Sequence, residues 1–170
     1  NPSTFVSGAV LTAAQQNVLA NNDRFFHGPP AVQVRRNAAL AIATGGWEEV
    51  TLDTEDWDTN TMWSSTAATK VFCRTAGKFL VMFQGGFASS TVGTDRGVGF
   101  RKNSTSGDPD WSVMINHDQL AGTAGNGGTG TVALTTGQYV QLVMIHNVGS
   151  NLNTSTAAFT PTISMLWVSS

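Results

Sequence analysis

The sequence predicts an all-β sandwich preceded by one short helix. From residue 31 onward, short apolar or alternating runs are separated by clusters of Gly, Asn, Asp, Ser and Thr, which is typical of sandwiches and barrels. Ahead of this region stands a single helix-start pattern that Gly28-Pro29-Pro30 brings to an end. At 170 residues the chain is long enough to bury a core. We therefore divide it into an N-terminal segment, residues 1–30, and a sandwich domain, residues 31–170.

The N-terminal segment predicts a helix that begins near Thr12. Thr12 and Gln15 have the spacing of a capping box, in which each side chain hydrogen-bonds to a backbone amide of the first turn. We expect the helix to run to about Asp23. A helix of about 10 to 12 residues is only marginally stable by itself in water, so this one needs a partner.

The apolar residues of this helix allow two partners. A spacing of three and four relates several of them, as in a short heptad stretch that pairs with copies of itself. These residues are Leu11, Ala14, Val18 and Phe25, with Asn21 at the remaining seam position. The alternative is that Val18, Leu19 and Phe25 fold back onto the domain of the same chain. Two heptads do not decide between these interpretations.

The domain predicts about eight or more strands, separated by turn-forming clusters. The candidate runs are 32–35, 40–43, 47–52, 70–74, 78–87, 97–102, 111–116, 131–134, 139–147 and 159–168. The last run alternates: Ile163, Met165 and Trp167 share one face, and Thr162 and Ser164 the other. It is therefore expected to be a half-buried strand that carries the C-terminal end of the chain into a sheet.

Two of these runs are apolar on both faces. In the run 78–87, Leu80 and Met82 oppose Phe79, Val81 and Phe83; in the run 139–147, the same alternation involves Leu142 and Met144. A strand of a sandwich needs only one apolar face, so the second face requires a cover. We favour another subunit, with loop packing as the alternative. The subunit-interface candidates are Leu11, Val18, Phe25, Leu80, Met82, Leu142 and Met144.

Composition excludes several classes of partner. The formal net charge is -2 and only 12% of residues are charged, with no run of Lys or Arg, so we expect no nucleic acid. No stretch approaches the ~18 to 20 apolar residues of a membrane span, and residues 1–30 lack a secretory signal pattern. We expect a soluble chain that is not visibly exported. Since it opens at Asn1 without Met, processing and a longer parent protein both remain open.

Cys73 is the single cysteine and lies in an apolar run, so no disulfide can form within the chain. We expect it to be a small buried residue, because nothing near it in sequence supplies an activating base. The histidines His27, His117 and His146 lie far apart, and no motif completes a catalytic site around them. We expect surface or interface histidines and no enzyme activity.

An acidic stretch with two tryptophans contains the candidate ligand residues. Asp53, Glu55 and Asp58 supply the oxygen atoms that calcium prefers, but the Gly and distal Glu of an EF-hand loop are missing. A solvated loop whose side chains cap turns is therefore favoured over a metal site, and we expect no cofactor. Trp57 and Trp63 lie in polar sequence and are the candidate ligand-binding residues, because aromatic faces complement pyranose rings; core packing is the alternative.

Gly125, Gly127 and Gly130 match a dinucleotide-binding expression, but β-like sequence flanks them on both sides, so we expect a flexible hairpin tip. Together with the loops 91–95 and 104–110, the stretch 122–130 is expected to face outward.

The order of four stretches resembles the C1q/TNF-like jelly roll, in the form found in structural proteins of tailed bacteriophages. The stretches are 10–17, 53–59, 76–81 and 134–142. The third and fourth contain the turns Ala76-Gly77 and Thr136-Gly137, each followed by an alternating strand. This resemblance implies a jelly-roll β-sandwich over residues 31–170 and a homotrimer around a threefold axis. The residues from Phe159 to Ser164 depart from the last strand of C1q-like chains, which favours the viral branch.

The resemblance leads to two functional expectations. The first is a non-enzymatic bacteriophage virion surface protein, a homotrimeric capsid decoration or head-fibre protein that docks on the major capsid or another virion protein through its N-terminal segment. Its expected location is the particle surface. The second is a tail-fibre or receptor-binding lectin-like module that recognises host surface glycans. A polysaccharide-degrading enzyme has the least support, because no carboxylate pair or nucleophile constellation can be assembled.

Overall fold

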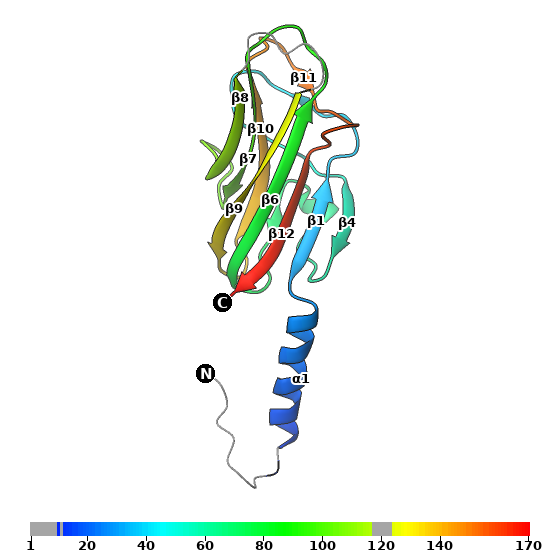
Figure 1. Ribbon diagram of the computed structural model, residues 1–170, viewed down its shortest axis with the longest axis vertical. Helices are drawn as coiled ribbons and strands as arrows, with labels where there is room; N and C mark the ends of the chain where they lie inside the picture. The colour runs from blue at the N-terminus through cyan, green and yellow to red at the C-terminus, as the bar shows by residue number, and fades with distance from the viewer. Residues whose placement is uncertain (1–9, 11, 117–123) are drawn as a thin grey trace.

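The computed structural model describes residues 10, 12–116 and 124–170, and it has the predicted all-β architecture with one short helix (Figure 1). Two sheets pack face to face. The five-stranded sheet, called sheet A here, has the order β4-β1-β12-β6-β9. Its strands are β4 (Thr54–Asp58), β1 (Ala31–Arg35), β12 (Thr162–Ser169), β6 (Gly77–Phe87) and β9 (Ala124–Leu134).

The second sheet, sheet C, has the order β3-β10-β7-β8, and β5 also pairs with β10. Its strands are β3 (Glu48–Glu49), β10 (Tyr139–His146), β7 (Asp95–Lys102), β8 (Trp111–Asn116) and β5 (Val71–Phe72). A short pair, β2 (Ala41–Ile42) with β11 (Leu152–Asn153), and the 3-10 turn η1 (Ser65–Ala67) complete the described elements. All of the strand pairs are antiparallel.

The helix α1 (Ala13–His27) begins with the predicted capping box. The Gln15 amide donates to Thr12 Oγ1 at 3.3 Å, and the Thr12 amide donates to Gln15 Oε1 at 2.9 Å. The helix runs one turn beyond the predicted end, up to the bend at Gly28 that precedes the two prolines. It extends from β1 away from the sandwich (Figure 1). No helix in the described part of the chain has the length and apolar character that crossing a membrane requires.

The core lies between the two sheets and confirms much of the predicted alternation. Phe79, Val81 and Phe83 of β6 point inward, as do Ile163 and Met165 of β12. Cys73 is fully buried, as expected. Because each strand contributes every second residue to this layer, the period of two in the sequence was sufficient to orient β6 and β12.

Strand β10 corrects one prediction. Leu142 and Met144 are fully buried core residues of the single chain, so they are not available to a neighbouring subunit. The opposite face of β10 is covered by the chain itself. Val143 on this face is fully buried, and a Cβ on Gly97 would lie 2.7 Å from Ile145 and 2.9 Å from the Trp47 ring, so this ring lies over the sheet. The loop-packing alternative is correct for β10.

The glycine-rich stretch corrects a second prediction. Its described part belongs to β9, which pairs with β6 along its whole length, and is not a hairpin tip. The glycines let aromatic side chains approach the strand: a Cβ on Gly125 would lie 2.1 Å from Phe159, and one on Gly130 would lie 2.8 Å from Trp111. Glycine in a strand often marks such a close approach. The acidic stretch is likewise partly a strand, because Thr54–Asp58 forms β4.

Candidate functional site

The outer face of sheet A is the main surface on which side chains of different strands form one array. Strand register defines its rows: Leu80 of β6 lies opposite Leu166 of β12, and one row further on Met82 lies opposite Ser164. In the next row Gln84 lies opposite Thr162. This face therefore has an apolar half, centred on Leu80, and a polar half, centred on Thr162.

The apolar half lies at the end of the sheet from which α1 leaves, since Leu166 pairs with Ala31 at the start of β1. Met82 is 41% exposed, Val168 is more exposed still, and Leu80 and Leu166 are half-buried. A shallow cavity of about 350 Å³ continues this surface. It is lined by Lys78, Phe79, Thr131, Val132, Ala133 and Val168.

The helix exposes a second apolar surface at the same end of the molecule. Val18 is 52% exposed and Leu19 is also exposed, so the sandwich covers neither of them. Phe25 instead contacts its own chain: its ring meets the ring of Trp167 edge to face, with centroids 4.5 Å apart. The fold-back alternative thus holds for Phe25 and not for Val18. Leu11 lies outside the described residues.

Trp167 joins the helix, the linker and the sheet. Its indole Nε1 donates to the carbonyl of Ala76 at 3.2 Å, and its amide donates to the carbonyl of Pro30 at 2.9 Å. Sequence analysis placed Trp167 on the same face of the last strand as Ile163 and Met165 but missed this role. No local pattern marks the contact, because it joins residues 25, 76 and 167.

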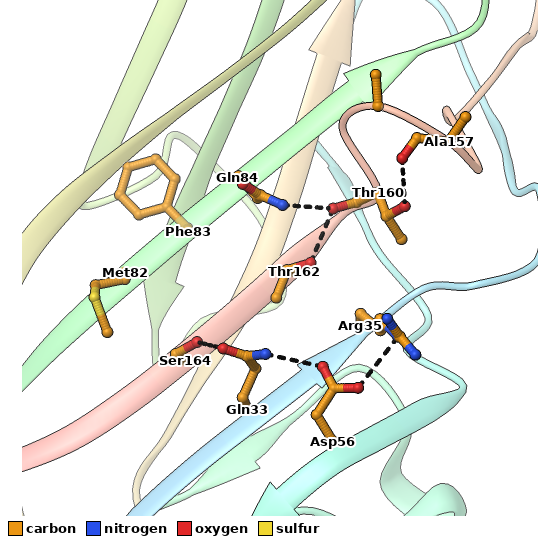
Figure 2. Close-up of a pocket in the computed structure, with 11 residues that line it drawn as sticks. Gln33, Arg35, Asp56, Met82, Phe83, Gln84, Ala157, Thr160, Thr162 and Ser164 are labelled. Atoms are coloured by element: carbon orange, nitrogen blue, oxygen red, sulfur yellow. Dashed lines mark hydrogen bonds and ion pairs between the residues drawn. The ribbon is translucent and has the colours of Figure 1, made fainter.

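The polar half of the outer face contains a cavity of about 400 Å³ (Figure 2). A chain of contacts crosses three strands here: Ser164 Oγ donates to Gln33 Oε1 at 3.0 Å, and Gln33 Nε2 donates to Asp56 Oδ2 at 2.9 Å. Arg35 Nε lies 3.3 Å from Asp56 Oδ1. This contact is an ion pair without hydrogen-bond geometry, because the buried Nε has no hydrogen-bond partner among the described residues. Sequence analysis missed the pocket, whose residues come from four separate segments.

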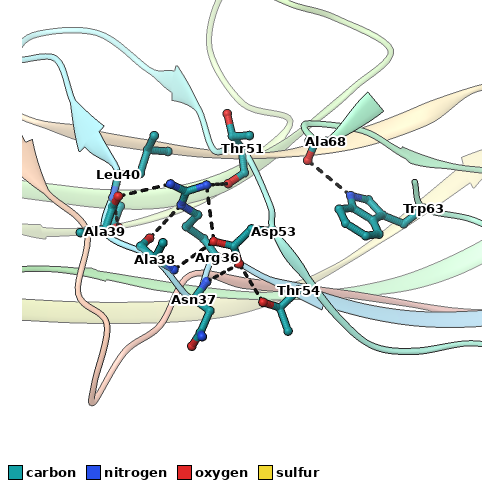
Figure 3. Close-up of polar contacts among 11 residues, drawn as sticks. Arg36, Asn37, Ala38, Ala39, Leu40, Thr51, Asp53, Thr54, Trp63 and Ala68 are labelled. Carbon is teal, nitrogen blue, oxygen red and sulfur yellow. Dashed lines mark hydrogen bonds and ion pairs between the residues drawn. The ribbon is translucent and has the colours of Figure 1, made fainter. Parts of the chain in front are cut away.

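The two candidate tryptophans have different environments. Trp63 is a core residue whose Nε1 donates to the carbonyl of Ala68 at 3.4 Å (Figure 3), so it cannot be a surface platform and that prediction is wrong. Trp57 is 42% exposed and lies directly opposite Gln33 in the register of β4 and β1. A bulge follows this pair, so Asp56 is the extra residue of β4.

The three acidic candidates are engaged separately, and the structure does not bring them together. Asp53 Oδ1 accepts from the Asn37 amide at 2.7 Å and Oδ2 from the Ala38 amide at 3.0 Å, and Arg36 Nη1 lies 3.5 Å from Oδ2 (Figure 3). Partial burial acts to raise the pKa of Asp53, but these hydrogen bonds lower it below its usual value. Asp58 accepts from the amides of Asn60 and Trp63, while Glu55 is exposed.

These carboxylates therefore organise turns, as the favoured interpretation predicted. In the part of the chain that the structure describes, no three His, Cys, Asp or Glu side chains converge to hold a metal ion.

His146 is buried, which contradicts the expectation of a surface or interface histidine. Its Nε2 lies 2.9 Å from the carbonyl of Ile42, and its Nδ1 accepts from the Val148 amide at 3.3 Å. His27 is exposed and lies 3.4 Å from Asp23, and His117 lies outside the described residues. Burial raises the pKa of the Cys73 thiol, which leaves it inert at neutral pH. Cys73, the single cysteine, is therefore not an activated nucleophile.

The two-sheet arrangement is a C1q/TNF-like jelly roll, as the sequence predicted. The globular domain of zebrafish complement 1qA is similar to this chain, with a TM-score of 0.58 and 15% identity, over 83% of this chain and 99% of that chain. Murine APRIL is similar with a TM-score of 0.61 and 11% identity, over 82% and 98% of the two chains.

The TNF protein Eiger of S. frugiperda is similar with a TM-score of 0.59 and 10% identity, over 82% and 94% of the two chains. At these identities the likeness shows the fold alone. No protein-family model and no curated protein matches the sequence.

Proposed function

We propose that this chain is a non-enzymatic, homotrimeric surface protein of a bacteriophage virion, a capsid decoration or head-fibre protein. The observation that carries the proposal is the uncovered apolar half of the outer face of sheet A, which lies at the end of the sheet from which α1 leaves with Val18 and Leu19 exposed. Trimerisation and the virion location follow from the resemblance of the sequence and go beyond the fold itself.

Self-association accounts for both exposed surfaces at once. Met82 lies on a central strand of sheet A, where a large apolar side chain normally has a cover. Burial of apolar surface contributes about 25 cal/mol per Å², so covering this face and the Val18 side of α1 in one step favours an assembled state. A short helix that is marginal alone is stabilised when copies pack against one another.

The proposed mechanism is attachment and display. In the trimer the three helices leave the same end of the sandwich, so they form one element that docks on the major capsid or another virion protein. The sandwich is the rigid head, and the exposed loop 104–110 faces outward from it.

Analytical ultracentrifugation tests self-association with a matched pair of variants. Met82 on sheet A and Met114 on the opposite side of the sandwich are 41% and 40% exposed. We expect a trimer for the parent chain, dissociation by Met82→Glu because it would place a charge in the contact, and no change by Met114→Glu. A parent chain that stays monomeric at high concentration, with and without residues 1–28, would remove the trimer proposal.

The second candidate function is a lectin-like, receptor-binding module for host surface glycans. One observation favours it: Trp57 stays exposed beside a polar pocket that contains Asp56. A glycan array separates the two functions. Specific binding that Trp57→Ala abolishes supports the lectin, whereas no binding to any glycan on the array opposes it. Turnover of host-wall polysaccharide would contradict the proposal that the protein is not an enzyme.

A further inference from the structure

The polar pocket of sheet A combines a cavity with side chains that are already oriented. Its volume of about 400 Å³ lies in the range of small-molecule sites. Its lining comes from β1, β4, β6 and β12 and from the loop 157–160 (Figure 2). Because strands hold most of these groups, a ligand would not have to order a flexible segment when it binds.

Each side chain of the network keeps hydrogen-bonding capacity beyond its internal contacts. Gln33 uses its carbonyl and one N–H, which leaves a second N–H. Arg35 pairs with Asp56 through Nε, so its two Nη groups are additional donors. Ser164 Oγ donates to Gln33 and can still accept a hydrogen bond. Each carboxylate oxygen of Asp56 makes one contact within the network and can accept a further hydrogen bond. Donors and acceptors therefore alternate around one cavity.

This pattern selects the chemistry of the ligand. A hydroxyl group both donates and accepts, so neighbouring hydroxyls on a ring match alternating donors and acceptors. Arg35 and Asp56 offset each other's charge, which favours a neutral ligand over an anion or a cation. Met82 at the pocket edge offers apolar surface to the C–H side of a ring. We propose that this pocket binds a neutral sugar unit of a glycan.

Trp57 extends the site along β4. It follows Asp56 directly and lies opposite Gln33, and the bulge at this point places both β4 residues beside the same segment of β1. An aromatic ring that is 42% exposed gives a face for stacking of a second sugar unit. The site therefore suits an oligosaccharide better than a monosaccharide.

This inference deepens the second candidate function and is separable from self-association. The apolar half around Leu80 lies next to α1, whereas Arg35 and Gln84 occupy the row furthest from it. Met82 lies both in the proposed contact and at the pocket edge, so a contact between copies along the apolar half would cover the Met82 side of the pocket and leave the row of Arg35 and Gln84 at its rim. Sedimentation of the same samples then reports association, and sugar binding reports the pocket.

Saturation-transfer NMR with defined sugars tests the pocket. The probes are methyl glycosides of glucose, galactose, mannose and N-acetylglucosamine, their disaccharides, and glucuronate as a charged comparison. We expect saturation transfer to at least one neutral glycoside and none to glucuronate. Asp56→Asn should lower the affinity about tenfold, because one charged hydrogen-bond partner is lost. Trp57→Ala should weaken disaccharide binding more than monosaccharide binding.

Two controls match these variants. Trp111 is 49% exposed at the far edge of the sandwich, and Asp108 is exposed in the loop 104–110, so Trp111→Ala and Asp108→Asn should leave binding unchanged. The proposal is overturned if the folded parent chain gives no transfer to any neutral sugar, if glucuronate binds better, or if Asp56→Asn and Trp57→Ala bind like the parent. A trimer that binds no sugar would contradict this inference and would not contradict the first proposed function.

Discussion

Acidification should destabilise this fold through His146, a buried histidine that the structure holds neutral. Both ring nitrogens have partners that suit the Nε2-protonated form: Nε2 donates to the Ile42 carbonyl, and Nδ1 accepts from the Val148 amide. Protonation of Nδ1 would break the second contact. The ring also lies against Phe87, over which the buried guanidinium of Arg96 lies at 5.9 Å. A second positive charge here would lie near that of Arg96, whose own charge is partly offset by its neighbour Asp95.

The direction of the effect follows from these contacts. Burial lowers the pKa of His146, the hydrogen bond to Ile42 acts in the opposite sense, and Arg96 lowers it further, so the folded pKa lies below 6.5. The unfolded chain binds the proton near 6.5, whereas the folded chain binds it only at lower pH. Stability is therefore complete above about pH 6.5 and falls as the pH drops, by at most about 1.4 kcal/mol per pH unit, until the folded pKa is reached.

Urea denaturation at fixed protein concentration between about pH 7.5 and pH 5 measures this loss. We expect the unfolding free energy of the parent chain to fall over this range and that of His146→Gln to stay flat. Asp53 does not interfere, because its lowered pKa makes its contribution fall only at more acidic pH. If the variant does not fold, the pH titration of the His146 imidazole resonance in the parent chain still tests whether its pKa is lowered. A resonance that titrates near pH 6.5, or a parent stability that stays constant across the range, would refute the reasoning.

Three further predictions concern stability and the helix. Gly130→Val should cost about 1 to 3 kcal/mol in urea denaturation, because its side chain meets an aromatic ring, whereas Gly46→Ala should be neutral because nothing lies near its Cβ position. Asp53→Ala should cost about 1 to 2 kcal/mol in the same assay, since two backbone amides lose their acceptor; no loss would mean that water replaces the carboxylate. Trp167→Ala should speed proteolysis of the linker between α1 and β1 while the sandwich stays folded, and an unchanged cleavage rate would show that the indole does not hold the helix.

Strands with a strict period of two could be predicted from the sequence, and those that depend on their neighbours could not. β6 and β12 carry their apolar residues at alternate positions, which orients them without further information. β9 begins with a glycine-rich stretch whose composition is typical of a turn. It is a strand because it pairs with β6 along its whole length, and its glycines leave room for Phe159 and Trp111. Glycine content alone cannot distinguish these cases.

In the candidate site, too, some residues follow from their local sequence pattern and others depend on neighbouring segments. Met82 and Val18 were predicted as exposed apolar residues from their own strand and helix patterns, and they are exposed. Met144 carried the same pattern as Met82, but it is buried in the core while Trp47 lies over the opposite side of the sheet. Trp47 lies just before the two-residue strand β3, where no period in the sequence marks which residues it contacts, so the cover of β10 could not be predicted. Trp57 and Trp63 likewise differ in burial. Trp57 is exposed on β4, whereas the Trp63 amide donates to Asp58 Oδ2 and the Trp63 ring packs in the core.

The polar and apolar halves of the outer face of sheet A place different demands on an assembly. Apolar side chains around Leu80 gain from any cover that excludes water, so they favour association without fixing its geometry. Arg35 and Asp56 have the opposite property, because burying this ion pair under an apolar surface would remove its water without supplying new hydrogen-bond partners. An assembly through this face is therefore driven from the end near α1 and limited at the far row. This limit leaves the pocket accessible at the rim, where a glycan could reach it.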